Sequence, residues 1–341
     1  MKKVGLVVLL LLLLLIGWYW SLIVYGVGQG LGQLNIVWNA RPIVEVLNDP
    51  AFPDSLKSKL RIIDEIKAYA IDSLGLKDSD NYKTVFDQKG KELMWVVTAS
   101  EPFQLKAKTW DFPVIGTVPY KGYFDKDKAI TEMKQLQEEG WDVGVRNPGG
   151  WSTLGWFTDP ILSGMLERNE GDLASLIIHE MVHATIFIKD SVEFNENLAS
   201  FIGDSAAYSF IAAKYGRQSQ EYLTYVYEVV DHQRYSNHVL RGSIALDSLY
   251  STFAEVDPDD FKKSKKDAMI QQIISSMDTL TLHQYKIPTQ RFKERPPNND
   301  YFLAYRRYQS KQIDFKAELE GKYHGDLREM IRAYTIRFPF L

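Results

Sequence analysis

The sequence predicts an α+β fold, in which a small mixed sheet with helices is followed by a mainly helical C-terminal half. Short apolar stretches of strand character lie between residues 93 and 146. From Pro160 onward these strand signals fade and helical patterns take their place. An uncharged stretch at residues 4–24 predicts, in addition, one N-terminal transmembrane helix.

The composition indicates a folded protein and excludes several partners and chemistries. The chain has 341 residues, of which 45% are hydrophobic, and its net charge is -4. These values are typical of a globular protein. Because the chain has no Lys/Arg stripe interleaved with aromatic residues, no nucleic-acid partner is predicted. Because it has no cysteine, any metal ion must be held by His, Asp or Glu.

The N-terminus predicts attachment to a membrane. At about 1.5 Å per residue, residues 4–24 form a helix of roughly 31 Å, which matches the hydrocarbon core of a bilayer. A cleavable signal peptide is the alternative, but the apolar run is long for one and no Ala-x-Ala site follows it. Lys2 and Lys3 favour a cytoplasmic N-terminus. We therefore expect a single-pass protein of the cell membrane, with its folded domain on the extracytoplasmic (periplasmic) side.

Three segments follow from this reading. Residues 1–24 are the predicted transmembrane anchor. Residues 25–40 are rich in glycine and carry no charge, so we interpret them as a juxtamembrane connector. Residues 41–341 are the predicted folded domain.

The first half of this domain contains strands and helices. A helix begins at Asp54 or Ser55, repeats its apolar residues at three- and four-residue intervals, and ends at Gly75. A second helix ends at Gly140 and lies between the strands predicted at residues 112–120 and 141–146. Strands are predicted at residues 93–99, 112–120 and 141–146, and a further one at residues 151–157.

The second half is predicted to be helical. Residues 173–188 are apolar on nearly every side and follow a possible cap at Asp172, which predicts a buried helix. Another helix is predicted at residues 197–216. We expect further helices up to the C-terminus, with breaks at residues 257–259 and 286–299.

The predicted buried helix carries the His-Glu-x-x-His pattern. His179 and His183 lie four residues apart and therefore share one face of the helix. In this pattern the two imidazoles bind zinc, and the glutamate, here Glu180, accepts a proton from the zinc-activated water. Two core histidines satisfied by other groups, with no metal, are the alternative interpretation.

A third zinc ligand is expected nearby, because catalytic zinc usually has three protein ligands. Glu196 fits best, since it falls in the first turn of an antiparallel helix that faces His183. Glu193 is the main rival, because the ends of helices are predicted only to within several residues. Asp190 and Asp204 are the other acidic residues close in sequence.

These segments resemble known families. HEMVH and NENLAS are similar to the His-Glu-x-x-His and Asn-Glu-x-x-Ala/Ser pair of the gluzincin peptidases, although their spacing here is shorter. A closer resemblance, to a bacterial family called putative or predicted aminopeptidases, extends to ARPIVEVL, YKGYFD, WSTLGWFTDPIL and PPNN. The chain departs from that family in lacking its lipidation cysteine. The resemblance implies that His179, His183 and Glu196 bind Zn²⁺ and that Glu180 is the general base.

The resulting prediction is a membrane-anchored zinc peptidase, aminopeptidase-like, that acts on peptides. The alternative is a non-enzymatic, membrane-anchored binding module whose zinc site is structural or silent. Asn195 and Asp204 are candidates to hydrogen-bond the ligand histidines. Hydrolysis also needs a group that stabilises the oxyanion. Five downstream residues are candidates for that role: Tyr208, Tyr305, Tyr308, His232 and His238.

Overall fold

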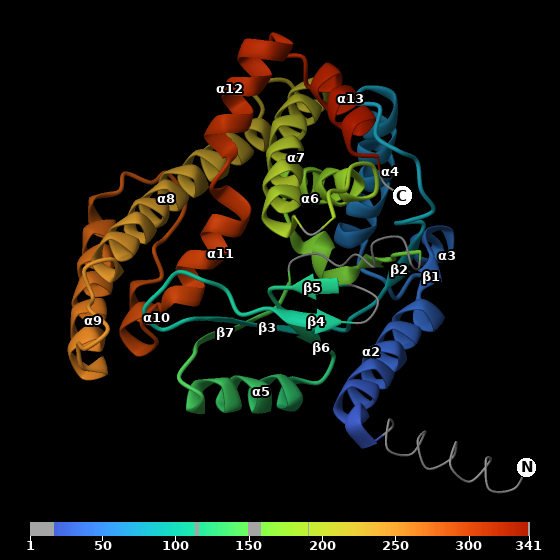
Figure 1. Ribbon diagram of the computed structural model, residues 1–341. Helices are drawn as coiled ribbons and strands as arrows, with labels where there is room; N and C mark the ends of the chain where they lie inside the picture. The colour runs from blue at the N-terminus through green and yellow to red at the C-terminus, as the bar shows by residue number, and fades with distance from the viewer. Residues whose placement is uncertain (1–16, 113–115, 149–157, 190, 340–341) are drawn as a thin grey trace, which may run out of the picture.

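The computed structural model describes residues 17–112, 116–148, 158–189 and 191–339, and its architecture is α+β, as the sequence predicts. Figure 1 shows α6 (Glu170–His183) and α7 (Val192–Tyr215) packed together near the centre, with α4 (Asp54–Asp72) beside them. The small sheets and α5 (Lys126–Glu138) lie below this helical layer in the same view, and α8 (Gln220–Tyr250) extends away from it.

The predicted transmembrane anchor is wrong. In the described part of the chain, no helix is both long and apolar enough to cross a membrane, so the predicted location as a single-pass membrane protein is wrong as well. Residues 4–16 of that prediction lie outside the described residues. The remaining residues continue into α2 (Trp20–Asn39), which also takes up the segment that we interpreted as a connector.

The polar residues of α2 explain this outcome. The helix carries Gln29 and Gln33, and one of its faces packs against the folded domain. The Tyr25 hydroxyl and the Gln29 amide each donate to the carbonyl of Gly122 at 2.9 Å. Gln33 and Ile36 are buried. The hydropathy of the N-terminal run does not reveal these contacts, because their partners lie far away in the sequence.

Two three-stranded sheets and one two-stranded sheet form the described β portion of the fold. In the first, β2 (Thr84–Phe86) pairs antiparallel with β1 (Arg41–Pro42) and parallel with β8 (Ile161–Leu162). In the second, β3 (Trp95–Ser100) is the central strand and pairs antiparallel with both of its neighbours. These neighbours are β6 (Lys121–Tyr123) and β7 (Asp142–Arg146).

The predicted strands at residues 93–99 and 141–146 are confirmed as β3 and β7. The predicted strand at residues 112–120 is not continuous: β4 (Trp110–Phe112) pairs antiparallel with β5 (Gly116–Val118). Residues 113–115 and the strand predicted at 151–157 lie outside the described residues.

Two predicted helices in the first half are also confirmed. The first is α4, and after it Gly75 takes a φ of +75°, a conformation that favours glycine. The second is α5, where the Asp125 carboxylate accepts hydrogen bonds from the backbone N–H groups of Asp127 and Lys128. A short helix, α3 (Ile43–Asn48), precedes α4.

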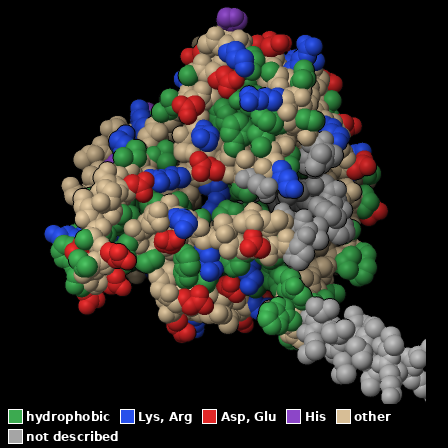
Figure 2. Space-filling view, in the orientation of Figure 1, with side chains coloured by type: hydrophobic (Ala, Val, Ile, Leu, Met, Phe, Trp, Pro, Cys, Tyr) green, Lys and Arg blue, Asp and Glu red, His purple; other side chains and the backbone are tan. Residues whose placement is uncertain are grey.

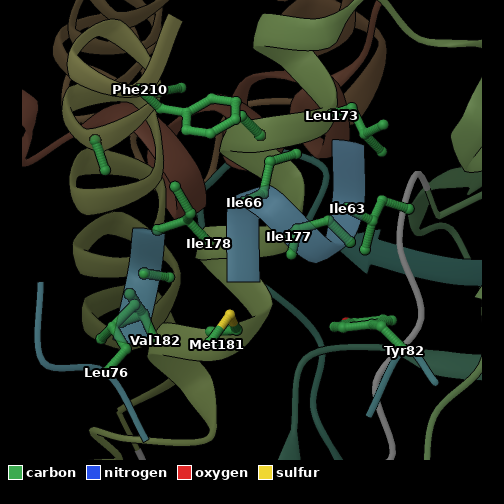
Figure 3. Close-up of a cluster of buried hydrophobic side chains, with 14 of the residues drawn as sticks. Ile63, Ile66, Leu76, Tyr82, Leu173, Ile177, Ile178, Met181, Val182 and Phe210 are labelled. Carbon is green, nitrogen blue, oxygen red and sulfur yellow. The ribbon is translucent and has the colours of Figure 1, made fainter. Parts of the chain in front are cut away.

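The main core surrounds α6, which follows the short 3-10 helix η1 (Ser163–Glu167). The start of α6 is fixed by Asn169, whose side chain accepts from the N–H of Asp172 at 2.9 Å, so the cap is not Asp172 itself. Apolar side chains of α6 meet those of α4 and α7, as Figure 3 shows. The labelled residues are Ile63, Ile66, Leu76, Tyr82, Leu173, Ile177, Ile178, Met181, Val182 and Phe210.

The prediction that this helix continues to residue 188 is wrong, because α6 ends at His183. The Thr185 hydroxyl then donates to the Met181 carbonyl at 2.7 Å. Ile186 forms a β-bridge with Pro339 near the C-terminus. These contacts draw the chain out of the helical path. In addition, α7 begins at Val192, five residues before the predicted start of the second helix.

The C-terminal part is helical, and both predicted breaks are present. The first break separates α8 from the next helix, and the second contains one short helix, α10. The Asn298 side chain caps the helix that follows it, by accepting from the N–H of Tyr301. The remaining elements are α9 (Asp259–Ser276), the 3-10 helix η2 (Met277–Thr279), α10 (Thr289–Glu294), α11 (Asn299–Gln309), α12 (Gln312–Tyr323) and α13 (Leu327–Arg337).

Candidate metal centre

The last turn of α6 presents two imidazoles on one face. His179 and His183 are one helical turn apart, and their Nε2 atoms approach to 3.0 Å. The His183 side chain is almost fully buried, and that of His179 is 16% exposed. Such close ring nitrogens have an obvious common partner in a cation held between them.

Glu196 on α7 completes the group. Its Oε2 atom lies 3.4 Å from Nε2 of His179 and 3.7 Å from Nε2 of His183. The three ligand atoms all lie within 4.8 Å of one another, so this group could hold a metal ion. Two imidazoles and a carboxylate are a donor set that suits a divalent transition metal such as zinc. The residues therefore fit the metal that the sequence pattern implies.

The other acidic residues considered as ligands are placed differently. The carboxylate of Glu193, the main rival, accepts a hydrogen bond from the Ser310 hydroxyl at 3.1 Å. Asp204 lies two turns further along α7 and accepts from the Ser175 hydroxyl at 2.7 Å. Asp190 lies outside the described residues.

The close approach of α6 and α7 depends on Gly203. A Cβ atom at this position would lie 2.7 Å from the backbone oxygen of Ser175 and 3.4 Å from Cβ of His179. Any larger residue would therefore separate the two helices. The antiparallel arrangement places Glu196 opposite His183, and residues later in α7 opposite earlier turns of α6.

Asn195 fixes the loop between the two helices. Its side-chain oxygen accepts from the N–H of Ile188 at 3.0 Å, and its amide donates to the Ile188 carbonyl at 2.8 Å. We considered Asn195 as a partner of the ligand histidines, but these contacts tie it to the loop. It acts on the centre by setting where α7 begins.

The residue next to His179 is instead Ser200, which our sequence analysis missed. Its hydroxyl lies 3.5 Å from Nδ1 of His179. In the tautomer that carries its proton on Nδ1, the serine hydroxyl accepts a hydrogen bond from that N–H group, and the Nε2 lone pair faces the centre. The available signal was its spacing, one helical turn after Glu196 on the same helix.

The three ligands also interact electrostatically. Burial alone would raise the pKa of Glu196, but the two imidazoles beside it hold that pKa well below its usual range. Burial likewise opposes a charged His183, yet the Glu196 carboxylate raises the pKa of this imidazole. The group therefore concentrates negative charge at Glu196, where a cation would be attracted.

Glu180 lies close to the ligand group and to Asp159. Its carboxylate makes no hydrogen bond or ion pair with any described residue, and burial raises its pKa. The buried Asp159 and the buried Tyr82 are close enough to interact with it electrostatically. Glu180 is thus a carboxylate in a low-dielectric setting, which favours its protonated form more than water does.

Tyr120, Tyr308 and Arg146 lie near Glu196. Burial and the nearby Glu196 raise the pKa of Tyr120 to about 12, and they also raise the pKa of Tyr308. Nη2 of Arg146 donates to the Tyr308 hydroxyl at 3.3 Å. Tyr120 and Arg146 were missed in the sequence, because they lie in separate short strands or turns far from the motif.

Among the five residues considered for the oxyanion, Tyr308 lies beside the ligand group. The other four contact different parts of the protein. Tyr208 and His232 interact with Asp204, Tyr305 packs against Tyr235 and Tyr301, and His238 bonds the Ile273 carbonyl.

The fold and the site together define an α+β protein with a candidate metal centre on its central pair of helices. The chain matches the model of the family described as "Putative aminopeptidase" over residues 24–335, so it belongs to this family. This membership indicates a peptidase-like function. No curated protein and no solved structure matched the chain.

Proposed function

We propose that this protein is a zinc-dependent, gluzincin-type peptidase that hydrolyses peptide bonds in an aminopeptidase-like manner. The observation that carries the proposal is the approach of two imidazoles and one carboxylate from adjacent helices, with all ligand atoms within 4.8 Å of one another. Membership of the aminopeptidase family supports the choice of peptides as substrates. The order of the ligands, two histidines on one helix and a glutamate on the next, supports the gluzincin type.

Each residue has a role in this proposal. His179, His183 and Glu196 hold the metal, and Ser200 keeps the His179 ring in position. A bound zinc ion supplies Lewis acidity, which lowers the pKa of a water molecule and polarises the scissile carbonyl. Glu180 accepts the proton of the attacking water and passes it to the leaving nitrogen. The Tyr308 hydroxyl donates a hydrogen bond to the oxyanion.

Metal analysis of the full-length chain tests the ligands. We expect about one zinc per chain by mass spectrometry. Glu196→Ala should lose most of this metal, because it removes a ligand. Glu193→Ala is the matched control, since its carboxylate lies on the same helix but bonds Ser310, and it should keep the metal. If Glu196→Ala retains as much zinc as Glu193→Ala, Glu196 is not a zinc ligand.

Glu180→Gln separates catalysis from metal binding. We expect this variant to keep its zinc and to lose hydrolysis of aminoacyl and dipeptide substrates by a factor of about 10² to 10⁴, because it cannot accept a proton. Turnover at the wild-type rate by the zinc-loaded variant would contradict the proposed role of Glu180. A zinc-loaded wild-type chain that cleaves no peptide would favour a binding module whose metal site is catalytically silent.

A further inference from the structure

Two arginines beside the candidate metal centre have no carboxylate within ion-pairing distance among the described residues. Arg307 is only 7% exposed, yet its guanidinium makes no hydrogen bond or ion pair in the described part of the chain. Arg146 makes one hydrogen bond, to the Tyr308 hydroxyl, and its buried Nε atom has no partner there. Buried charges in proteins are normally paired, and each guanidinium offers five N–H donors.

The neighbouring residue on α11 shows how unusual this is. Arg306 bonds the hydroxyl and carbonyl of Ser243 and forms an ion pair with Asp247, although it is more exposed than Arg307. The same helix thus satisfies the more exposed guanidinium, whereas the buried one has no hydrogen-bond partner among the described residues.

Hydrogen bonds between the Asn197 side chain and the backbone hold the end of α11 beside α7, the helix that carries Glu196. Asn197 follows Glu196 directly and is fully buried. Its amide donates to the Arg307 carbonyl at 2.7 Å, and its side-chain oxygen accepts from the N–H of Lys311 at 2.9 Å. These bonds fix the end of α11, with Arg307 and Tyr308, against the turn of α7 that carries Glu196.

Arg146 and Tyr120 reach the same place from the β portion of the fold. Arg146 is the last residue of β7, and its guanidinium carbon lies 5.7 Å from the centre of the Tyr308 ring. Tyr120 lies between β5 and β6 and interacts electrostatically with Glu196 and with both arginines. Figure 2 shows a hollow near the centre of the face in view, between α11 and the β4–β5 hairpin, with Lys or Arg side chains inside it.

Simple charge balance is the competing explanation, because Asp300 and Glu196 are both near. Asp300 interacts with both arginines only at longer range, and the hydroxyl of Thr98 donates to its carboxylate at 2.9 Å. Balance at a distance leaves most of the guanidinium N–H groups without acceptors among the residues that the structure describes. An anion that enters from solution would satisfy them.

We propose that Arg146 and Arg307, with the hydroxyl of Tyr120, form a subsite that binds a carboxylate of the substrate, and that Tyr308 lies between this subsite and the oxyanion. A carboxylate matches the planar donor pattern of a guanidinium and accepts two hydrogen bonds at once. This inference rests on the proposed peptidase function, since it places the subsite next to the group that would act on the peptide. A C-terminal carboxylate there selects short peptides, and an Asp or Glu side chain there selects an acidic residue.

Binding of defined peptides to the metal-free full-length chain tests the subsite without turnover. Calorimetry compares Leu-Phe with its C-terminal amide, and Leu-Glu amide with Leu-Gln amide. We expect the member that carries the carboxylate to bind about tenfold more tightly in one of the two pairs. The first pair reports a C-terminal carboxylate and the second an acidic side chain.

Substitutions locate the effect. Arg146→Gln and Arg307→Gln should each bring the ratio of the two dissociation constants in that pair close to one. Arg241→Gln, which removes the same charge from an exposed position on α8, should leave it unchanged. If Arg307→Gln fails to fold, the peptide comparison on the wild type and on Arg146→Gln still decides. Equal binding within both pairs, or a preference that survives Arg146→Gln, overturns the subsite.

The two proposals fail separately. If the zinc-loaded chain cleaves no peptide but still prefers the carboxylate, the peptidase proposal fails and the subsite stands. If it cleaves acids and amides equally well and binds them equally, the subsite fails and the peptidase proposal stands.

Discussion

The ligand residues differ in how far the sequence could predict them. His179 and His183 follow from the period of a helix, because side chains four residues apart must share a face. The prediction of Glu196 depends on where the next helix begins, and a slightly different start would favour Glu193. The fold distinguishes the two: Glu196 faces both imidazoles, whereas Glu193 bonds Ser310, more than a hundred residues away.

At the same scale, the arginines of the proposed subsite could not be predicted. Arg146 ends a short strand and Arg307 lies within a polar helix, and nothing in the local pattern of either segment indicates a site. The two arginines lie together only because β7 and α11 contact each other in the fold. The Asn298 amide contributes to that contact by donating to the Val143 carbonyl at 3.1 Å.

Ser200 gives the first testable prediction. Ser200→Ala removes the hydroxyl that lies 3.5 Å from Nδ1 of His179. Because partners of this kind orient a ligand imidazole, we expect zinc affinity to fall by about tenfold, measured by competition with a chelator. Ser205→Ala, on the same helix but without a side-chain hydrogen bond to any described residue, is the control. An unchanged affinity in Ser200→Ala would show that packing alone orients the ring.

At the scale of elements, the centre depends on two helices that nearly touch. The sequence predicts both helices but not their ends, because the contacts that end them are distant. The β-bridge between Ile186 and Pro339 takes the chain away from α6, and the Asn195 side chain holds the loop that leads to α7. Local propensity alone would have continued the first helix.

Gly203→Ala tests this close approach. The added Cβ would meet the Ser175 carbonyl at 2.7 Å, and backbone yields less easily than a side chain. We therefore expect the free energy of unfolding to fall by about 1–3 kcal/mol in urea denaturation. The same variant should bind zinc more weakly, since α7 would carry Glu196 away from the histidines.

The matched control for that variant is Gly321→Ala. Gly321 lies near the end of α12, and a Cβ there would meet nothing within 4 Å. Alanine should be neutral or stabilising there by up to about 1 kcal/mol, because glycine costs more backbone entropy in a helix. Equal losses of stability in the two variants would show that the Gly203 effect does not come from the contact between α6 and α7.

For the whole molecule, the N-terminal segment shows the limit of hydropathy. The apolar run predicts a membrane helix because the window sees only local composition. In the fold, the described end of that run belongs to α2, whose Tyr25 and Gln29 are bonded to Gly122 of the second sheet. A helix that packs on a folded domain through polar groups cannot be recognised until its partner is known.

Charged residues of both signs lie near the ligand group. Glu180 interacts electrostatically with the ligand group and with Asp159, whereas Arg146 interacts with Glu196 and donates to the Tyr308 hydroxyl. A peptide in its usual ionised form carries a positive amine at one end and a negative carboxylate at the other. The proposed subsite at Arg146 and Arg307 would therefore favour one direction of binding for such a peptide.

Metal binding should stabilise the whole domain, because the ligands lie on the two helices at the centre of the main core. A ligand that binds only the folded state adds stability in proportion to the logarithm of its concentration, about 2.7 kcal/mol at a hundredfold excess over Kd. For a chain of this size we expect the midpoint of thermal unfolding to rise by roughly 5 °C in zinc.

Variants test whether the rise in the unfolding midpoint comes from zinc at the proposed site. Glu180→Gln and Glu193→Ala should show the full rise in the unfolding midpoint, because neither removes a proposed ligand. Glu196→Ala should lose the rise, because it removes one of three ligand atoms from the folded state. Differential scanning calorimetry with and without a chelator measures the rise. A zinc-dependent rise that persists in Glu196→Ala would mean that zinc binds elsewhere, and the central helices would then need another explanation for their paired imidazoles.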